Sequence, residues 1–270
     1  MKPQKKKRSV KEKIVFIIFC LLVLIAVPAF ALAGGPFGAP APLCQDDSGL
    51  HTSAGYWFGQ TKYKKPSGVL MRQNQIYSEA GYAIKKYGDI YVRVGASDFK
   101  ITDAFASLSA ATVTNKNDFN DEANVFGTLG VKGFYPVNNV FGLGMFMQGT
   151  FYFGNVRDKV YGIETGEPFA LELKLKNLWN ISGGFGLQIS APLGIKLYAG
   201  TYGYYTEATV YPRVNIAGLP FSSGREKIKS KTNWGGYTGL YAPLGKGFGL
   251  NVEGQYSERL SAGVAVTYTY

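Results

Sequence analysis

Apolar and polar residues alternate along most of the chain, from about residue 52 to the C-terminus. In the longest example, residues 171–191, every second residue is largely apolar and the residues between them are largely polar. Successive side chains of a β-strand point to opposite faces, so this period of two predicts strands that face two different environments. The example covers about 20 residues, whereas a tilted transmembrane strand needs only about 9 to 11. We therefore expect part of it to project beyond a membrane.

The same alternation predicts ten strands separated by short and long connections in turn. The strands are expected near residues 52–63, 73–86, 89–101, 123–135, 139–154, 170–190, 194–210, 228–241, 246–257 and 260–270. Tight links are expected at 87–88, 136–138, 191–194 and 242–245, long loops at 64–72, 102–122, 155–169 and 211–227, and a short last link at 258–259. Turns then fall on one side and loops on the other. This predicts an all-β fold, an antiparallel up-and-down transmembrane β-barrel of about 10 strands, with 8 or 12 as alternatives.

The N-terminus has the pattern of an export signal. Residues 2–13 contain seven Lys or Arg residues, and residues 14–33 are uncharged and mostly apolar. Pro28 interrupts this run, which ends in the small-x-small triplet Ala31-Leu32-Ala33. A basic segment followed by an apolar one is typical of a secretory signal peptide. We predict a signal peptide at residues 1–33, cleaved before Gly34, rather than an uncleaved anchor, then a flexible linker at 34–51 and a barrel domain at 52–270.

Charge and rare residues exclude several classes of function. Most of the formal net charge of +11 belongs to residues 1–33, so the mature chain offers little support for nucleic-acid binding. The chain has one His, and it has two Cys, of which Cys20 lies in the signal peptide. His51 and Cys44 alone cannot form a tetrahedral metal site, and His51 falls on the turn side, away from the loops. We predict no enzyme activity, no cofactor and no metal.

The last strand carries the most specific pattern. Every second residue back from the C-terminus is apolar, namely Tyr270, Tyr268, Val266, Val264, Ala262 and Leu260. This ending resembles the outer-membrane β-barrel superfamily, and the whole mature chain is most similar in pattern to small OmpA-like or porin-like barrels. The resemblance implies export to the outer membrane of a Gram-negative bacterium, contact with lipid and lipopolysaccharide, and recognition by the barrel-assembly machinery through Leu260, Val264, Val266, Tyr268 and Tyr270. The terminal residue is Tyr, where the commonest form has Phe.

Aromatic clusters near the strand ends are expected to form girdles at the two membrane interfaces. They are Tyr56-Trp57-Phe58, Phe134-Tyr135, Phe151-Tyr152-Phe153 and Tyr202 with Tyr204-Tyr205. The many glycines, 35 in all, are expected to pack a narrow lumen.

Polar residues on the opposite face of the strands are predicted to line the lumen. The candidates are Glu79, Lys85, Arg93, Lys132, Gln188, Lys196 and Glu253, together with Asn251 and Gln255. Ten strands enclose little more space than side chains fill. We expect these residues to form an internal network of paired charges, with a pathway for ions or small solutes as the alternative.

A basic cluster near the fourth long loop is a candidate for binding lipopolysaccharide phosphates, with a solvated surface as the alternative. It consists of Arg225, Lys227, Lys229 and Lys231. The predicted function is a structural or surface-interaction role in the outer membrane without catalysis. The alternatives are a narrow porin-like channel and a soluble periplasmic ligand-binding barrel.

Overall fold

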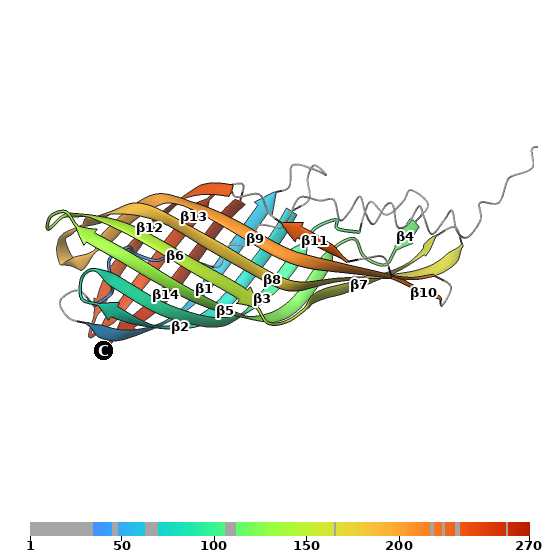
Figure 1. Cartoon of the computed structure of the whole chain (residues 1–270), viewed down its shortest axis with the longest axis horizontal. Coiled ribbons are helices and arrows are strands. Elements are labelled where there is room, and N and C mark those ends of the chain that lie inside the picture. The colour runs from blue at the N-terminus through green and yellow to red at the C-terminus, as the bar shows by residue number, and fades with distance from the viewer. Residues whose placement is uncertain are drawn as a thin grey trace, which may run out of the picture.

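Ten long strands form one closed antiparallel barrel in the computed structural model of the chain (Figure 1). The structure describes residues 35–44, 48–62, 70–105, 112–164, 166–216, 219–222, 225–229, 233–257 and 259–270. The barrel strands are β1 (Gly49–Lys62), β2 (Leu70–Ile84), β3 (Gly88–Ile101), β5 (Phe119–Pro136), β6 (Phe141–Tyr152), β8 (Glu167–Ser190), β9 (Lys196–Ile216), β12 (Asn233–Gly245), β13 (Phe248–Tyr256) and β14 (Arg259–Thr269). Each of the ten predicted strands is present, so the predicted fold class is confirmed.

The first and last strands close the barrel. β1 pairs with β14 from His51 opposite Thr269 to Thr61 opposite Arg259. A closed sheet leaves no row of unpaired backbone groups, which is the condition for a sheet to stand in lipid. Among the described residues, no helix is long and apolar enough to cross a membrane.

The barrel wall has its apolar side outside. In β6 exposed and buried residues alternate without exception. The outward residues Leu143, Met145 and Met147 are 49%, 68% and 55% exposed, whereas the inward Gln148 and Thr150 are buried. A protein folded in water has the opposite arrangement. The exposed side chains therefore form a lipid-facing surface, and the polar ones face the lumen.

This arrangement predicts a depth-dependent cost of charge on the outer wall. Val264 lies outward in the middle of β14, opposite Tyr56 and Val252. We expect Val264→Lys to lower the free energy of unfolding in lipid vesicles by about 2–4 kcal/mol, because the ammonium group would lie deep in hydrocarbon. Leu260→Lys, at the loop-side end of the same strand, is the control and should cost only about 0–1 kcal/mol. Equal costs at the two positions in urea titrations would contradict a membrane-spanning β14.

Two barrel strands continue past the wall on the loop side, as predicted for residues 170–190 (Figure 1). Four short strands extend this region: β4 (Thr112–Thr114), β7 (Val156–Glu164), β10 (Leu219–Ser222) and β11 (Glu226–Lys229). The hairpin of β7 and β8 pairs from Val156 opposite Leu175 to Glu164 opposite Glu167. These four strands lie within segments that the alternation pattern assigned to long loops or, for β11, to the start of β12.

Large inward aromatic side chains lie directly opposite glycines on the neighbouring strand. The pairs are Trp57 with Gly263, Tyr77 with Gly55, Tyr91 with Gly130, Phe126 with Gly95, Tyr198 with Gly239, Tyr202 with Gly235 and Tyr237 with Gly200. A Cβ atom added to any of these glycines would collide with the aromatic side chain opposite. The lumen therefore holds wide rings because the opposite wall positions have no side chain.

The predicted aromatic girdles are only half correct. Tyr56, Tyr135 and Phe153 do point outward, but Trp57 and Tyr152 are buried in the lumen. Tyr202 and Tyr204 are buried there as well. Consecutive residues of a strand point to opposite faces, so a run of adjacent aromatics must divide between the lipid and the lumen.

Two of the predicted tight links, 191–194 and 242–245, contain the sequence Pro-Leu-Gly. Only the first of them is a turn. Residues Pro192–Gly194 form a short 3-10 turn between β8 and β9. The predicted link at 242–245 instead belongs to β12, and the chain reverses at Lys246 and Gly247, both with positive φ. The register shift between Pro243 and Gly245 absorbs the extra residue.

Candidate functional site

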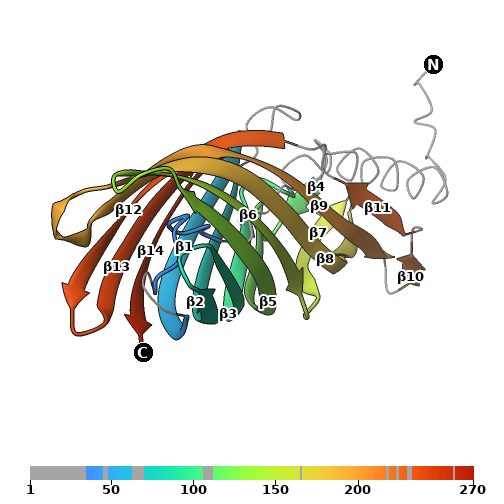
Figure 2. The same ribbon diagram turned by 60° about the vertical axis from the view of Figure 1, so that its left-hand side comes forward.

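A segment near the N-terminus fills the turn-side half of the lumen. Residues 35–44, called the plug below, lie inside the barrel, where Figure 2 shows them in blue next to β1. Phe37 is 1% exposed and stacks on Phe146 with ring centres 4.0 Å apart. The rings of Tyr202 and Tyr237 pack against it edge-on. Within the stretch expected to be a flexible linker, residues 34–51, the described residues 35–44 are a plug inside the lumen, and β1 begins at Gly49.

Side chains from the wall hold the backbone of the plug. The carboxylate of Glu253 accepts hydrogen bonds from the nitrogens of Phe37 and Gly38, at 2.9 and 2.8 Å. Further contacts join Gln188 Oε1 to the nitrogen of Ala41 at 3.1 Å, Arg93 Nη2 to the oxygen of Pro36 at 3.2 Å, Lys132 Nζ to the oxygen of Ala39 at 3.4 Å, Lys196 Nζ to the oxygen of Pro42 at 3.3 Å, and Gln148 Nε2 and Gln255 Nε2 to the oxygen of Gly35 at 3.4 Å. Six of the predicted lumen residues, Glu253, Gln188, Arg93, Lys132, Lys196 and Gln255, thus bind the plug directly.

The composition of the plug suits this position. Its irregular backbone lies away from water, where each N–H and C=O group needs a partner. Pro36, Pro40 and Pro42 have no N–H group, which leaves fewer donors to satisfy. The small side chains of Ala39 and Ala41 fit between the wall residues, where both are buried.

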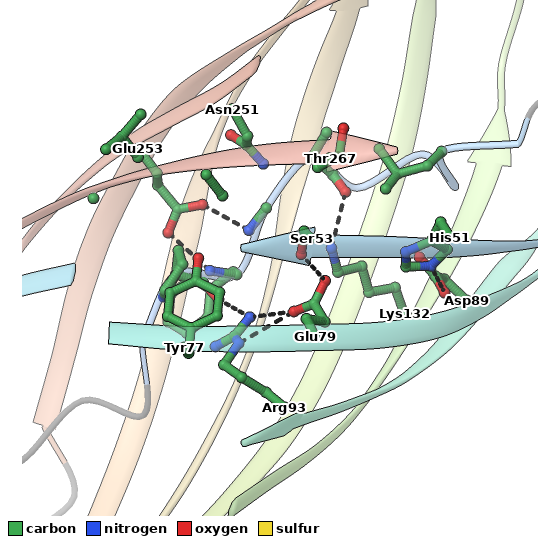
Figure 3. Close-up of a pocket in the computed structure, with 18 residues that line it drawn as sticks. His51, Ser53, Tyr77, Glu79, Asp89, Arg93, Lys132, Asn251, Glu253 and Thr267 are labelled. Carbon is green, nitrogen blue, oxygen red and sulfur yellow. Dashed lines mark hydrogen bonds and ion pairs between the residues drawn. The ribbon is translucent and has the colours of Figure 1, made fainter. Parts of the chain in front are cut away.

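Arg93 and Glu79 form a buried ion pair beside the plug (Figure 3). Arg93 Nη2 lies 2.6 Å from Glu79 Oε2, and the two side chains are 3% and 11% exposed. Ser53 Oγ donates to the other carboxylate oxygen at 3.1 Å. The guanidinium group also lies over the ring of Tyr77, 4.5 Å from its centre. Two of the predicted lumen residues therefore pair with each other, whereas Glu253, Lys132 and Lys196 contact the backbone of the plug.

Several lumen residues escaped the sequence prediction. His51 Nε2 lies 2.9 Å from Asp89 Oδ1, and both residues are buried at the turn side (Figure 3). A second group joins Tyr91 to Gln148 at 2.8 Å and joins Gln73 and Gln75 to the hydroxyl of Tyr152. Asp89, Tyr91 and Arg93 are spaced two residues apart on β3 and therefore point to the same, inward face. The alternation pattern could have identified Asp89, at the start of the strand, and the uncharged Tyr91 as lumen residues.

Lys85 was predicted in the lumen and is not there. β2 ends at Ile84, and Lys85 is an exposed turn residue with a φ of 49°. Its backbone nitrogen donates to Ser48 Oγ at 3.2 Å. The strand alternation stops where the backbone leaves the extended conformation, so the phase of β2 does not place Lys85.

The structure describes three of the four residues of the predicted lipopolysaccharide-binding cluster. Arg225 is exposed on the loop side; Lys227 and Lys229 belong to β11, opposite Thr209 and Glu207, and Lys231 lies outside the described residues. Their binding of lipopolysaccharide stays a prediction.

Cys44 lies at the turn-side rim of the barrel, and its sulfur is 3.9 Å from the backbone oxygen of Leu50. Burial and the nearby Asp89 raise the pKa of this thiol.

A second barrier closes the loop side of the lumen. Phe99, Phe119, Phe126 and Tyr152 pack with residues of β7 and β8 into one buried apolar cluster.

An ion pair orders the chain outside the wall. Asp118 accepts a hydrogen bond from the backbone N–H of Asp103 and pairs with Lys100, and these two contacts lower the pKa of Asp118. This contribution to loop order is present at neutral pH and is lost as the pH falls through the lowered pKa.

The lumen is therefore filled at two levels, by the plug on the turn side and by the aromatic cluster on the loop side. Within the described ranges, no group of three His, Cys, Asp or Glu residues is placed to hold a metal ion. The wall side chains bind the peptide backbone of the plug through amide, ammonium, guanidinium and carboxylate groups.

The chain is similar in fold to solved bacterial barrels at low identity. The outer membrane protease OmpT from Escherichia coli is 10% identical with a TM-score of 0.45, and the match covers 83% of this chain and 95% of that one. The attachment invasion locus protein Ail of Yersinia pestis is 13% identical with a TM-score of 0.34, covering 84% and 100%. The KdgM porin is 11% identical with a TM-score of 0.28, covering 81% and 99%. A scan against family models and a search of curated proteins found no match.

Proposed function

We propose that this protein is an outer-membrane β-barrel of a Gram-negative bacterium with a filled lumen and a structural or surface-interaction role. The observation that carries the proposal is the combination of an apolar outer wall with a lumen occupied at two levels. An apolar wall suits lipid, whereas a lumen filled by the chain itself does not suit the passage of solutes.

The last strand supports assembly in the outer membrane. Leu260, Val264 and Val266 point outward and are 57%, 42% and 46% exposed. Tyr270 follows β14 at the turn side and is 75% exposed. A row of exposed apolar residues along the closing strand suits capture by the barrel-assembly machinery before β14 pairs with β1.

We also propose that the protein is not an enzyme. Its single His is buried in the wall at the turn side, where Nε2 is engaged by Asp89 at 2.9 Å. The projecting strands and loops lie at the other end of the barrel (Figure 1). A substrate approaching from outside would meet those strands and loops, so His51 is remote from it. We therefore propose that the surface of β7, β10, β11 and the projecting ends of β8 and β9, rather than the lumen, carries the function.

The closed lumen predicts a silent barrel in a conductance measurement. We expect the purified protein, refolded in detergent and added to a planar lipid bilayer, to give no discrete channels. Folding in each preparation is checked by the heat-dependent shift in gel migration that compact barrels show. Discrete channels whose ion selectivity changes in Arg93→Ala or Lys132→Ala would instead support the narrow-channel alternative. Release of the protein from cells without detergent would support the soluble alternative.

A further inference from the structure

Basic residues form a band on the outward face of the strands that project past the wall (Figure 1). Leu171 and Leu175 of β8 belong to the buried apolar cluster. The residues in the opposite alternation phase, Lys174 and Lys176, therefore point to the outside. Arg157 of β7 lies directly opposite Lys174. Arg157 is exposed and the two lysines are half-buried, and these three residues are called the basic band below.

The basic band lacks acidic partners. Within the described part of the chain, no ion pair joins any of its three residues to a carboxylate. Glu172, on the same face of β8, lies 4.0 Å from Lys159 instead. Arg157 and Lys174 carry like charges at directly opposite positions of two strands, an arrangement that destabilises a sheet. An anion bound between them would remove this repulsion.

Outward aromatic residues lie between the apolar wall and the basic band. Trp179 of β8 lies opposite the outward Phe151, and its ring centre is 5.5 Å from that of Tyr205. Trp and Tyr collect at the level of lipid headgroups. Lys176 follows on the loop side of Trp179 along β8, within about 10 Å at the rise of a strand. Its ammonium group lies over the ring of Tyr211, 5.0 Å from the ring centre. The basic band is therefore at headgroup height.

We propose that the basic band binds phosphate groups of lipid headgroups in the outer leaflet. A guanidinium donates two parallel hydrogen bonds to a phosphate, and an ammonium adds a point charge. A phosphate between Arg157 and Lys174 takes both, and Lys176 lies on the same face of the strand for a neighbouring phosphate. The inference rests on the outer-membrane location proposed above and names a partner for the proposed surface. It uses none of the four residues of the cluster predicted from the sequence.

The direction of the band favours a membrane lipid over a soluble polyanion. β8 and β9 stay paired along their whole length, so the band faces the same way as the apolar wall below it. A ligand on this face lies beside the barrel, where the lipid is, and not above its end. The aromatic residues next to the band fit the same environment.

Retention of a phosphorylated lipid by the refolded protein tests the inference. The protein in alkyl glycoside micelles is mixed with lipid A, whose sugar headgroup carries phosphates, and the lipid that stays bound after detergent exchange is counted per barrel. We expect the triple variant Arg157→Gln, Lys174→Gln and Lys176→Gln to retain about tenfold less lipid. Lipid A stripped of its phosphates should be retained equally poorly by the natural protein and the variant.

The matched control removes the same charge at the opposite end of the barrel. It carries the substitutions Lys85→Gln, Lys86→Gln and Lys246→Gln, all at exposed turn residues. This control should retain lipid A as the natural protein does. The heat-dependent gel shift checks that both triple variants fold. A soluble probe, inorganic polyphosphate, distinguishes the source of the phosphate: it should bind the natural protein about tenfold more weakly than lipid A does at equal phosphate concentration.

A stability measurement separates phosphate binding from a merely structural role. In micelles without phosphate, Lys174→Gln removes the repulsion from Arg157, so the urea midpoint of unfolding should rise. With lipid A added, the same substitution removes a phosphate partner, so the midpoint should fall relative to the natural protein. A shift of the same sign in both conditions would contradict the proposed site.

Other results would also overturn the inference. They are equal retention of lipid A by the natural protein and the band variant, equal retention of lipid A with and without its phosphates, or polyphosphate binding as tight as that of lipid A, which would assign the band to a soluble polyanion. These outcomes are separable from failure of the proposed function. Band-dependent retention by a barrel that conducts ions would refute the silent lumen alone, and a silent barrel with band-independent retention would refute this site alone.

Discussion

Arg93→Leu is expected to lower the free energy of unfolding by about 3–5 kcal/mol. The substitution leaves the carboxylate of Glu79 in the lumen without the guanidinium that lies 2.6 Å away. Lys132, in the same pocket, already donates to the plug at Ala39. An unpaired charge in this position is costly because water cannot replace the lost partner. The check is a urea titration of the folded fraction in lipid vesicles.

The double variant shows how much of this loss comes from the unpaired charge. Glu79→Leu with Arg93→Leu removes both charges, and we expect it to recover at least half of the loss. Full recovery is not expected, because Arg93 also holds the oxygen of Pro36 and packs over Tyr77. Lys85→Leu, in the exposed turn, is the control and should stay within about 0.5 kcal/mol of the natural protein. A double variant as unstable as the sum of its single variants would contradict a coupled pair.

Gly130→Val is expected to prevent formation of the compact barrel. Gly130 lies opposite Tyr91, and a Cβ atom at this position would overlap the tyrosine ring. Tyr91 cannot move aside without losing its hydrogen bond to Gln148 and its position beside Arg93. The extra atoms must displace the backbone, at a cost of about 3 kcal/mol or more. Loss of the heat-dependent gel shift after refolding is the measurement.

Two further variants separate this steric clash from a general need for glycine. Gly149→Val places the same side chain on β6, where an added Cβ would meet nothing closer than the oxygen of Asn180 at 4.0 Å. That variant should fold like the natural protein. Tyr91→Ala combined with Gly130→Val should restore the gel shift at least in part, since the ring no longer occupies the space. A double variant that folds no better than Gly130→Val would show that ring overlap is not the cause.

Much of the wall could be predicted because alternation is a local property. The period of two identifies all ten barrel strands and the outward face of β14, since a strand shows its two environments without reference to its neighbours. It also places Arg93, Gln188, Lys196 and Glu253 inside. The prediction failed for Lys85, because β2 ends at Ile84, two residues before the predicted end at residue 86.

The extension beyond the wall was harder to predict for a physical reason. β7 pairs with the end of β8 that continues past the barrel, and β10 and β11 pair with β9. β10 and β11 have only four residues each, and β7 carries apolar residues on both faces, since Val160 is buried and Ile163 is exposed. A period of two is weak evidence in such segments, and the partner strand supplies most of the reason to be extended.

The sequence by itself determined the class of this protein: a long chain of alternating apolar and polar residues can bury its backbone groups in lipid only by closing a sheet. Only the tertiary structure decided what fills that sheet. The segment rich in Gly, Pro and Ala has no periodic pattern, and its position depends on contacts with residues far along the chain, such as the bond between Phe37 and Glu253. The fit of Tyr91 against Gly130 likewise exists only once β3 and β5 pair in register. Such contacts join residues whose separation in sequence carries no signal, and they turn an ordinary barrel pattern into one with a filled lumen.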